Sequence, residues 1–495
     1  NEGTISVNGA EATGVYNTGH FLMDNINAKI NVKGSQSIAL YAKETDPTHT
    51  KTELKKGTVK SEDGAVALYS DQADITLDNT SGNLKLVAGN GGLLFYNYKS
   101  SNPNDYAGQF TINGPVVADI ESGGYGFYLK NATINNVSGQ VQGVPAFLDA
   151  MFNITANKLK VKMQSGGTFM VLHKPTGGSM KLSSVSNLAA INSALGSKVE
   201  LEAPTTGSYK VYSVYRGKLE INQDVNLDND ESTATTDAFY KVDFRSSNML
   251  VEAGKTVSGT KQGQVALFQG NFNEGAGGDV GTVGDVSIVN NGTIKLTGNS
   301  ITTGPVASRK TTTAMAGDFI TLTNNKTIEV TGDNGIGIYG AGGSKILNNA
   351  GASLTVGQEG VALYGANKLN SSTLGDGTIS VTNAGDIQGV NGKTKAFGIF
   401  AENTSSTVTD SNLTNSGTID FSSSQESIGI HSINSTVSNT GNIKMGLKGV
   451  AINSKNSDIN STGDIVLAGN GIAFNLGGTF TGRTLNFSSK VTLNG

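Results

Sequence analysis

One sequence pattern recurs along most of the chain and limits its fold more than any other feature. A turn of the form Asn-x-Gly precedes a short strand of alternating apolar residues. A second turn containing Gly follows, and then a tight apolar strand that ends in an aromatic residue. The clearest copies span residues 325–339 and 350–364. Other copies end at the following residues: Tyr16, Tyr41, Tyr69, Tyr96, Tyr128, Phe400, and, without the Tyr or Phe, His431, Asn453 and Asn475.

The spacing of these end residues indicates a solenoid. Tyr41, Tyr69, Tyr96 and Tyr128 follow one another at intervals of 28, 27 and 32 residues, and Asn453 and Asn475 lie 22 apart. A period in this range that stretches by insertion is typical of stacked coils with variable loops. A third short strand fits before the next turn, as at residues 457–460. Three strands per coil predict an all-β fold, a right-handed parallel β-helix.

The same pattern predicts which side chains face the interior. Alternation along a strand should turn Ile336 and Ile338 inward and leave Gly337 facing outward, as well as Ala362 in the next copy. The Asn-x-Gly corners are expected to need backbone with positive φ, which Gly and Asn adopt at little cost. A leucine-rich repeat lacks support because its Leu pattern is missing, and the strands are too short and uneven for propeller blades.

The regular pattern is interrupted in the middle of the chain. We expect β-helix coils at 1–149, an irregular and protruding segment within the β-helix at 150–270, and regular coils at 271–495. Residues 184–195 resemble a short helix, with a Ser before it, apolar residues at helical spacing and Gly196 after it. The chain begins and stops inside a repeat, so we expect it to be a segment of a longer protein.

Composition excludes several classes of function. The chain has 66 Gly and no Cys among 495 residues, and its net charge is −4. Without Cys there is no disulfide framework and no thiol chemistry. No run of Lys or Arg exceeds two residues, so nucleic-acid binding lacks the positive patch that it requires. No apolar run reaches the roughly 18 residues that a membrane-spanning helix needs.

Catalytic and metal-binding patterns are weak. None of the four His residues lies in a motif of a serine protease, and His431 occupies the aromatic position of the repeat. Asp243 and Arg245 fall on one strand face, where an ion pair is the simpler interpretation. Asp224, Asp228, Asp230 and Glu231 offer oxygen ligands but lack the spacing of a calcium loop. We therefore expect no enzyme activity, no catalytic residue, no cofactor and no metal ion.

Aromatic residues outside the repeat are the candidate ligand contacts. Tyr98 and Tyr106 flank the loop at 99–105, and Tyr209, Tyr212 and Tyr215 lie in the interruption, next to Arg216. Tyr is a rigid side chain that contacts protein and sugar well. Because strand alternation separates Tyr209 from Tyr212, at least one of the two is expected in the core.

Three runs of the chain resemble a known family. Residues 209–219, 257–267 and 291–298 are similar to the passenger domains of large type V autotransporter adhesins of fusobacteria, of the RadD type. The similarity covers most of the chain, and the first two runs are more specific than the third. The membrane β-barrel of that family has no counterpart in this sequence.

The resemblance implies an adhesin on the bacterial cell surface, on the extracellular side of the outer membrane, or a secreted one. Its partners would be a host-cell receptor protein or glycan and the surface of partner bacteria. No ligand-contacting residue of the family can be matched here. A β-helical lyase or hydrolase acting on polysaccharide is the first alternative, and a purely structural stalk is the second.

Overall fold

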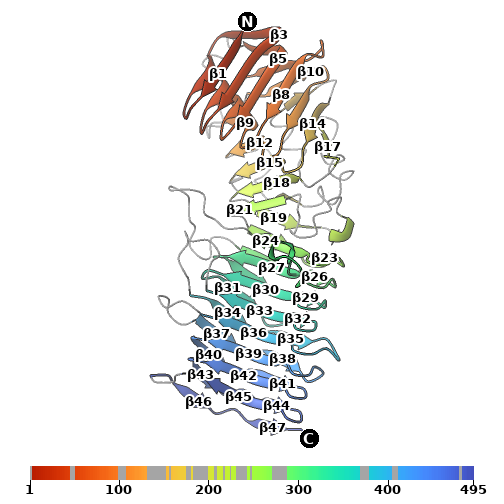
Figure 1. Cartoon of the computed structure of the whole chain (residues 1–495), viewed down its shortest axis with the longest axis vertical. Coiled ribbons are helices and arrows are strands. Elements are labelled where there is room, and N and C mark those ends of the chain that lie inside the picture. The colour runs from red at the N-terminus through yellow and green to blue at the C-terminus, as the bar shows by residue number, and fades with distance from the viewer. Residues whose placement is uncertain are drawn as a thin grey trace. The chain divides into compact units, whose positions relative to one another are not determined.

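The structure is a computed structural model, and the strand pairs that it describes in its sheets run parallel (Figure 1). It describes residues 3–44, 51–98, 108–130, 152–154, 158–173, 180–181, 199–205, 209–215, 218–222, 224–229, 242–245, 248–269, 287–367, 378–403, 411–478 and 482–494. Each coil adds one strand to each sheet, which confirms the predicted parallel β-helix. The helix expected at 184–195 lies outside the described residues.

By its internal contacts the chain divides into two compact units, of which unit 1 consists mainly of residues 1–219 and unit 2 mainly of residues 245–495. The irregular segment expected at 150–270 stays a prediction. Described residues within that range nevertheless include strands of the stacked sheets. In the described part of the chain, no helix has the length and apolar character needed to cross a membrane.

Unit 1 contains two sheets. The larger has ten strands: β1 (Thr4–Asn8), β3 (His20–Lys33), β5 (Lys51–Glu62), β7 (Ile75–Asp78), β8 (Leu84–Ala88), β10 (Phe110–Asn113), β11 (Val117–Ile120), β13 (Phe152–Ile154), β14 (Leu159–Met163) and β17 (Val199–Glu202). The other has eight: β2 (Thr13–Asn17), β4 (Ile38–Lys43), β6 (Val66–Asp71), β9 (Leu93–Tyr98), β12 (Tyr125–Lys130), β15 (Thr168–His173), β18 (Lys210–Tyr215) and β21 (Val242–Arg245).

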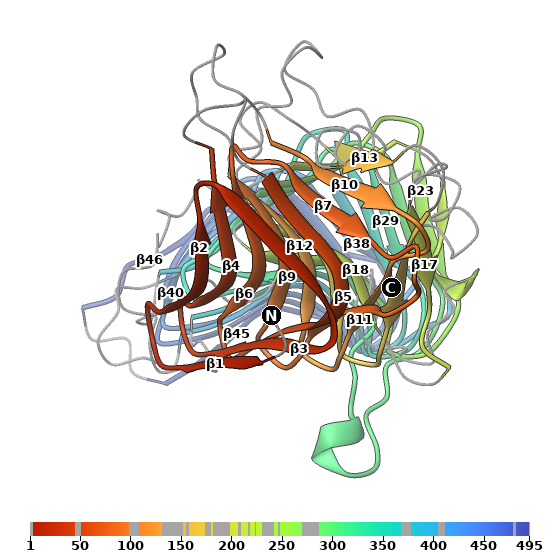
Figure 2. The ribbon, with the colours of Figure 1, turned by 90° about the horizontal axis from the view of Figure 1, so that it is seen from above.

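One long strand gives unit 1 its third side. The first part of β5 pairs with β7 and the second part pairs with β8, so the ten-stranded sheet folds around a corner. Gly57 lies between the two parts with φ +100°, and a Cβ there would lie 2.5 Å from the carbonyl oxygen of Ala28. Only Gly fits this backbone. Seen end on, the strands of unit 1 enclose a three-sided cross-section (Figure 2).

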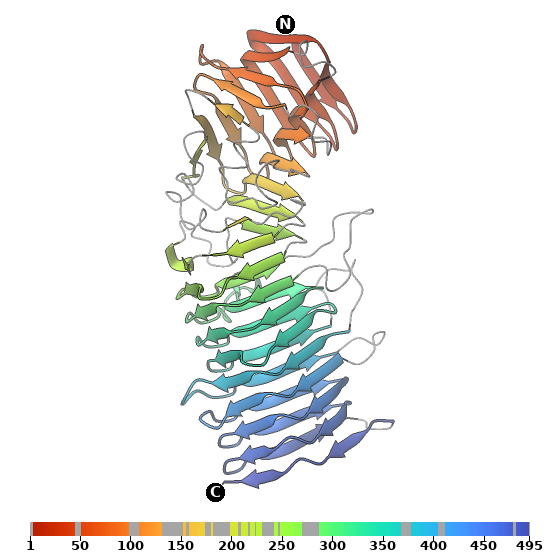
Figure 3. The same ribbon diagram turned by 180° about the vertical axis from the view of Figure 1, so that it is seen from behind.

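Unit 2 has three sheets, one for each side of its coils (Figure 3). Its first sheet holds β22 (Asn248–Val251), β25 (Ser287–Asn290), β28 (Thr321–Asn324), β31 (Lys345–Asn348), β34 (Ser380–Asn383), β37 (Ser411–Asn415), β40 (Ser435–Asn439), β43 (Asp458–Ser461) and β46 (Leu485–Phe487). Its second sheet holds β20 (Val225–Asn226), β23 (Thr256–Gly259), β26 (Thr293–Leu296), β29 (Thr327–Val330), β32 (Ser353–Val356), β35 (Asp386–Gly389), β38 (Thr418–Phe421), β41 (Asn442–Met445), β44 (Ile465–Leu467) and β47 (Val491–Leu493).

The third sheet of unit 2 carries the repeat's aromatic position. It holds β24 (Val265–Gln269), β27 (Thr313–Asp318), β30 (Ile336–Ala341), β33 (Val361–Ala366), β36 (Phe397–Glu402), β39 (Ile428–Ile433), β42 (Val450–Lys455) and β45 (Ile472–Gly477). The described chain also holds β16 (Met180–Lys181), β19 (Lys218–Ile221) and two single-turn 3-10 helices, η2 (Leu227–Asn229) and η3 (Val306–Ser308).

Columns of aliphatic residues fill the interior of unit 2. Ile294, Ile328, Leu354, Ile387 and Ile419 follow one another in register along the second sheet, and all are fully buried. Burying one such side chain contributes about 1.5–3 kcal/mol. In unit 1, five buried phenylalanines fill part of the interior, and the centroids of contacting rings lie 5.0–5.8 Å apart: Phe95, Phe110, Phe127, Phe152 and Phe169.

The predicted orientation of the small residues is wrong. Ala362 is fully buried, and Gly337 is buried too, whereas Ile336 is half-exposed. The strands of the third sheet are not regularly pleated, because their second and third residues both face the interior. A Cβ on Gly337 would lie 2.8 Å from Leu354 Cδ2. Even the Cβ of Ala would be too close at this position, since the backbone oxygen of Ala362 and the side chain of Leu354 occupy the space.

The Asn-x-Gly corners follow the prediction only in part. Gly351 has φ +79°, as expected, but Gly385 and Gly417 do not have positive φ. These two are small because a Cβ on Gly417 would overlap the backbone oxygen of Gly385 in the neighbouring coil. Positive φ also occurs at the second turn, where Asn334 (φ 58°) and Glu359 (φ 54°) stand two residues before the strands of the third sheet.

The Asn of each corner belongs to a buried hydrogen-bonded ladder. The side-chain Nδ2 of one Asn donates to Oδ1 of the next at 2.7–2.8 Å, and the members are fully buried: Asn290, Asn324, Asn348, Asn383, Asn415 and Asn439. Each member is the last residue of its strand in the first sheet. The ladder satisfies amide groups that would otherwise be buried without partners.

Replacing one member of the ladder should destabilise unit 2. Asn415→Ala leaves the Nδ2 group of Asn383 and the Oδ1 atom of Asn439 without their partners, which should cost about 2–4 kcal/mol. Asn412 is the matched control, because it lies exposed on the same strand. Denaturant unfolding should show a lower midpoint for Asn415→Ala than for the unaltered chain, and almost no change in the midpoint for Asn412→Ala. Equal midpoints for the two variants would contradict a stabilising role of the ladder.

Candidate functional site

Five tyrosines form a stack on the outer face of the eight-stranded sheet of unit 1. They are paired in register from strand to strand, and we call them the tyrosine ladder: Tyr16, Tyr41, Tyr69, Tyr96 and Tyr128. Neighbouring ring centroids lie 4.5–5.3 Å apart, and the rings are tilted by only 11–27°. Such pairs contribute about 0.5–1.5 kcal/mol each beyond the area that they bury.

Local strand geometry explains why these rings face outward. In β4 and β6 the second and third residues are buried, and the fourth, Tyr41 or Tyr69, returns to the surface. Coil stacking then places each ring over the next. Tyr16 on β2 is the most exposed, at 60% of its surface, and the others are half-buried.

The ladder presents ring edges and hydroxyl groups rather than ring faces. The Tyr41 hydroxyl donates a hydrogen bond of 2.5 Å to Asp71 Oδ2. Burial raises the pKa of Tyr69 strongly, and the neighbouring Tyr96, Tyr41 and Asp71 raise it further. The Tyr69 phenol therefore remains neutral in the physiological pH range.

An apolar row runs beside the ladder on the same face. Ile38, Val66, Leu93 and Tyr125 are the first residues of β4, β6, β9 and β12, are paired in register and are half-exposed. Together with Thr13 of β2 and the tyrosine ladder they define what we call the aromatic face of unit 1. Its ten side chains include no charged group.

The outer surface of the ten-stranded sheet has the opposite character. Its side chains form ion pairs within a strand, as between Lys60 and Glu62 at 3.0 Å, and between coils, as between Lys60 and Glu121 at 3.3 Å and between Lys160 and Glu202 at 2.6 Å. Burial alone would lower the pKa of Lys60, but its hydrogen bonds with the two carboxylates raise it overall.

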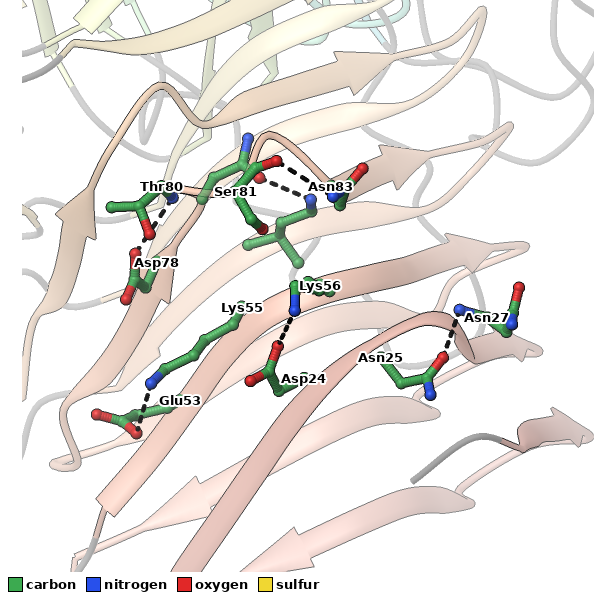
Figure 4. A network of polar contacts seen from close by, with 12 residues as sticks. Asp24, Asn25, Asn27, Glu53, Lys55, Lys56, Asp78, Thr80, Ser81 and Asn83 are labelled. Atoms are coloured by element: carbon green, nitrogen blue, oxygen red, sulfur yellow. Dashed lines mark hydrogen bonds and ion pairs between the residues drawn. The ribbon is translucent and has the colours of Figure 1, made fainter.

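Figure 4 shows a second group of such pairs on this sheet, where Lys56 contacts Asp24 at 2.9 Å and Lys55 contacts Glu53 at 3.9 Å. The hydrogen bond from Lys56 is the main cause of the lowered pKa of Asp24. Charges thus gather on the ten-stranded sheet and are absent from the ten positions of the aromatic face. The difference marks the aromatic face as a candidate interaction surface of unit 1.

Unit 2 has a comparable face on its third sheet. Its ladder contains Tyr339, Tyr364, Phe400 and His431, with neighbouring centroids 4.6–5.3 Å apart. The first three rings meet edge to face at 76–85°, unlike the parallel rings of unit 1. Beside them runs an apolar row that is half-exposed except for its exposed last member: Ile336, Val361, Phe397, Ile428, Val450 and Ile472.

His431 packs as a ring of this ladder, as its position in the repeat predicts. Its ring stacks on Phe400 at 4.6 Å, and its Nδ1 lies 2.8 Å from Asn453 Nδ2. Glu402 Oε1 is 3.6 Å from Nε2. Burial lowers the pKa of His431, and the nearby Glu402 only partly offsets this effect. In the described part of the chain, no three His, Asp or Glu side chains are grouped as a metal site would require.

The described carboxylates near residue 228 accept hydrogen bonds from a neighbouring segment of the chain. Asp228 accepts hydrogen bonds from Thr260 N and Oγ1 at 2.9 and 2.6 Å and from Gln264 Nε2 at 3.0 Å. Burial alone would raise its pKa, but these hydrogen bonds lower it overall. Asp224 Oδ1 accepts a hydrogen bond from Thr256 N. Asp230 and Glu231 lie outside the described residues, as do the side chains of Asp243 and Arg245.

Of the six tyrosine and arginine candidates, only Tyr209 has a side chain among the described residues. Tyr209 is buried with 4% of its surface exposed, in agreement with the expectation that Tyr209 or Tyr212 belongs to the core. The backbones of Tyr98, Tyr212 and Tyr215 lie in β9 and β18, but their side chains fall outside the described residues. Tyr106 and Arg216 lie outside them altogether. Ligand binding by these six residues stays a prediction.

Sequence reasoning overlooked two surfaces. The tyrosine ladder occupies the repeat's own aromatic position, whereas the predicted ligand contacts all lie outside that position. The second surface is the loop at 301–310, which projects from unit 2 (the green segment with η3 in Figure 2). Ile301 and Lys310 close its base with two backbone hydrogen bonds of 2.7 and 2.9 Å, and Val306 near the tip is 79% exposed.

Because Tyr339 is neutral in the folded chain, we expect unit 2 to lose stability at alkaline pH. Burial is the main cause that raises the pKa of Tyr339 from 10.0 to about 12, and Asp318 and Tyr364 add to it. Because the folded chain favours the neutral phenol, this stabilisation is complete below pH 10 and is lost as the pH rises through 12. Its upper limit is about 3 kcal/mol.

Denaturant unfolding at neutral pH and at a pH between 10 and 12 checks this, with tyrosinate absorbance as a second measure. Tyr339→Phe should lose less stability at the alkaline pH than the unaltered chain. An identical loss in both proteins would show that Tyr339 does not contribute.

The family resemblance stays a proposal after these findings. A comparison of the chain with protein-family models finds no match, and a comparison with curated protein sequences finds none either.

Proposed function

We propose that this chain is the extracellular binding region of a bacterial surface adhesin, similar to the passenger of an autotransporter. It attaches to a host-cell receptor or glycan or to the surface of other bacteria, without catalysing a reaction. The observation that carries the proposal is the uncharged aromatic face of unit 1, which lies next to a sheet whose surface is covered by ion pairs. Contiguous apolar surface that is rimmed by polar residues marks interaction sites.

The physical form of the face suits attachment. Its side chains are held in place by the strands and by contact with the neighbouring rungs, so binding costs little conformational entropy. Tyr combines a large contact area with a hydroxyl group that donates and accepts hydrogen bonds. A flat row of such residues can contact an extended partner surface along its length, whereas it does not enclose a small substrate.

A binding assay with fluorescent beads tests this proposal. Beads coated with the full chain should bind host cells or partner bacteria. The double variant Val66→Ser, Leu93→Ser should bind them at least ~10-fold less, because each change removes about 1 kcal/mol of apolar contact. The control variant Thr58→Ser, Lys85→Ser alters the ten-stranded sheet in adjacent coils and should bind as the unaltered chain does.

Equal binding by the double variant and the control would show that the aromatic face is not the attachment surface. If the unaltered chain binds no cell of either kind, the adhesin proposal fails and a structural stalk becomes the better interpretation. Circular dichroism of both variants confirms that they keep the β-helix.

A further inference from the structure

The tyrosine ladder restricts the chemistry of what it can bind. Sugars bind aromatic residues by packing on ring faces, but the faces of Tyr41, Tyr69 and Tyr96 are covered by their neighbours at 4.5–5.3 Å. Only ring edges and hydroxyl groups remain for a partner along the middle of the ladder. A partner must therefore make edge contacts at each rung.

The spacing of the rungs restricts the partner further. The rings repeat with the coils, so their spacing is that of hydrogen-bonded strands, about 4.8 Å. An extended peptide lying along the ladder presents side chains to one face about every 6.8 Å and loses register within two or three rungs. Another stack of parallel coils has the same repeat and can meet every rung.

The face is also complementary to itself. The Tyr41 hydroxyl already donates to Asp71 within the chain, so contact between two copies rests on the ring edges and on the apolar row. Ile38, Val66 and Leu93 supply apolar contact beside the rings. None of the ten residues of the face is charged, and Lys43 and Asp71, which lie beside it on β4 and β6, have opposite charges and are paired in register.

From these observations we propose that the aromatic face of unit 1 docks side by side on the same face of a second copy of this chain. This inference rests on the proposed attachment function and names its partner. Five rungs cover roughly 24 Å by 10 Å, or about 250 Å² per copy, against the ≈ 800 Å² per partner of a stable complex. Two chains in solution therefore associate weakly, whereas many copies on facing surfaces hold those surfaces together.

The central rung gives a sharp test. The two Tyr rows meet each other only when the two chains run antiparallel, and Val66 and Tyr69, which lie on the third of five rungs, then meet their own counterparts. Val66→Lys and Val66→Glu each place like charges opposite one another and should reduce the clustering of beads at least ~10-fold. Mixing Lys beads with Glu beads should restore clustering, because opposite charges then meet, and added salt should weaken this restored clustering only.

Thr58→Lys and Thr58→Glu are the matched controls, since Thr58 is half-exposed on the ten-stranded sheet, in the preceding strand of the chain. They should cluster as the unaltered chain does, alone or mixed. Thermal unfolding shows that all four variants are folded. Unreduced clustering of the single Val66 variants overturns the inference, and so does a Lys–Glu mixture that clusters no better than either variant alone.

Cell binding measured with the same beads separates this inference from the proposed function. Beads that bind host cells or other bacteria but do not cluster through Val66 disprove the self-association and leave the adhesin proposal standing. Beads that cluster through Val66 but bind no foreign cell support the self-association and disprove attachment to other surfaces.

Discussion

The hydrogen bonds that join each coil to its neighbours pair equivalent residues in register, as where Tyr339, Tyr364 and Phe400 succeed one another across β30, β33 and β36. Every side chain therefore lies over a counterpart from a neighbouring coil. A residue is acceptable at a position only if it packs well against a similar residue at coil spacing. This constraint explains the aliphatic columns, the asparagine ladder and the aromatic stacks alike.

The same constraint acts differently on charged and neutral columns. Like charges at coil spacing repel, so the charged positions of unit 2 change sign between neighbouring coils, as for Lys295 with Glu329 and Glu359 with Lys395. Asn and Tyr need no such change, because an amide donates to the next amide and a phenol ring stacks on the next ring. Long runs of identical residues are therefore confined to neutral columns, and they produce uniform surfaces.

The aromatic face follows from this rule and carries the functional proposals. Rings fixed by their neighbours on a sheet form a rigid, repeating and uncharged surface rather than a pocket. Such a surface recognises a partner by its repeat and flatness more than by one strong contact. Weak contacts of this kind become effective when many chains act together, as on a cell surface.

The sequence by itself determined the repeat, and with it the parallel β-helix, because strand alternation and turn residues are local signals. It also located the residues of both aromatic ladders, including His431. Only the tertiary structure decided how these residues are used. Gly337 and Gly417 looked like surface or turn glycines, but their size is set by Leu354 and by the backbone of a neighbouring coil. The uncharged aromatic face was likewise hidden in the sequence, since its successive rungs lie 25 or more positions apart and become neighbours only when the coils stack.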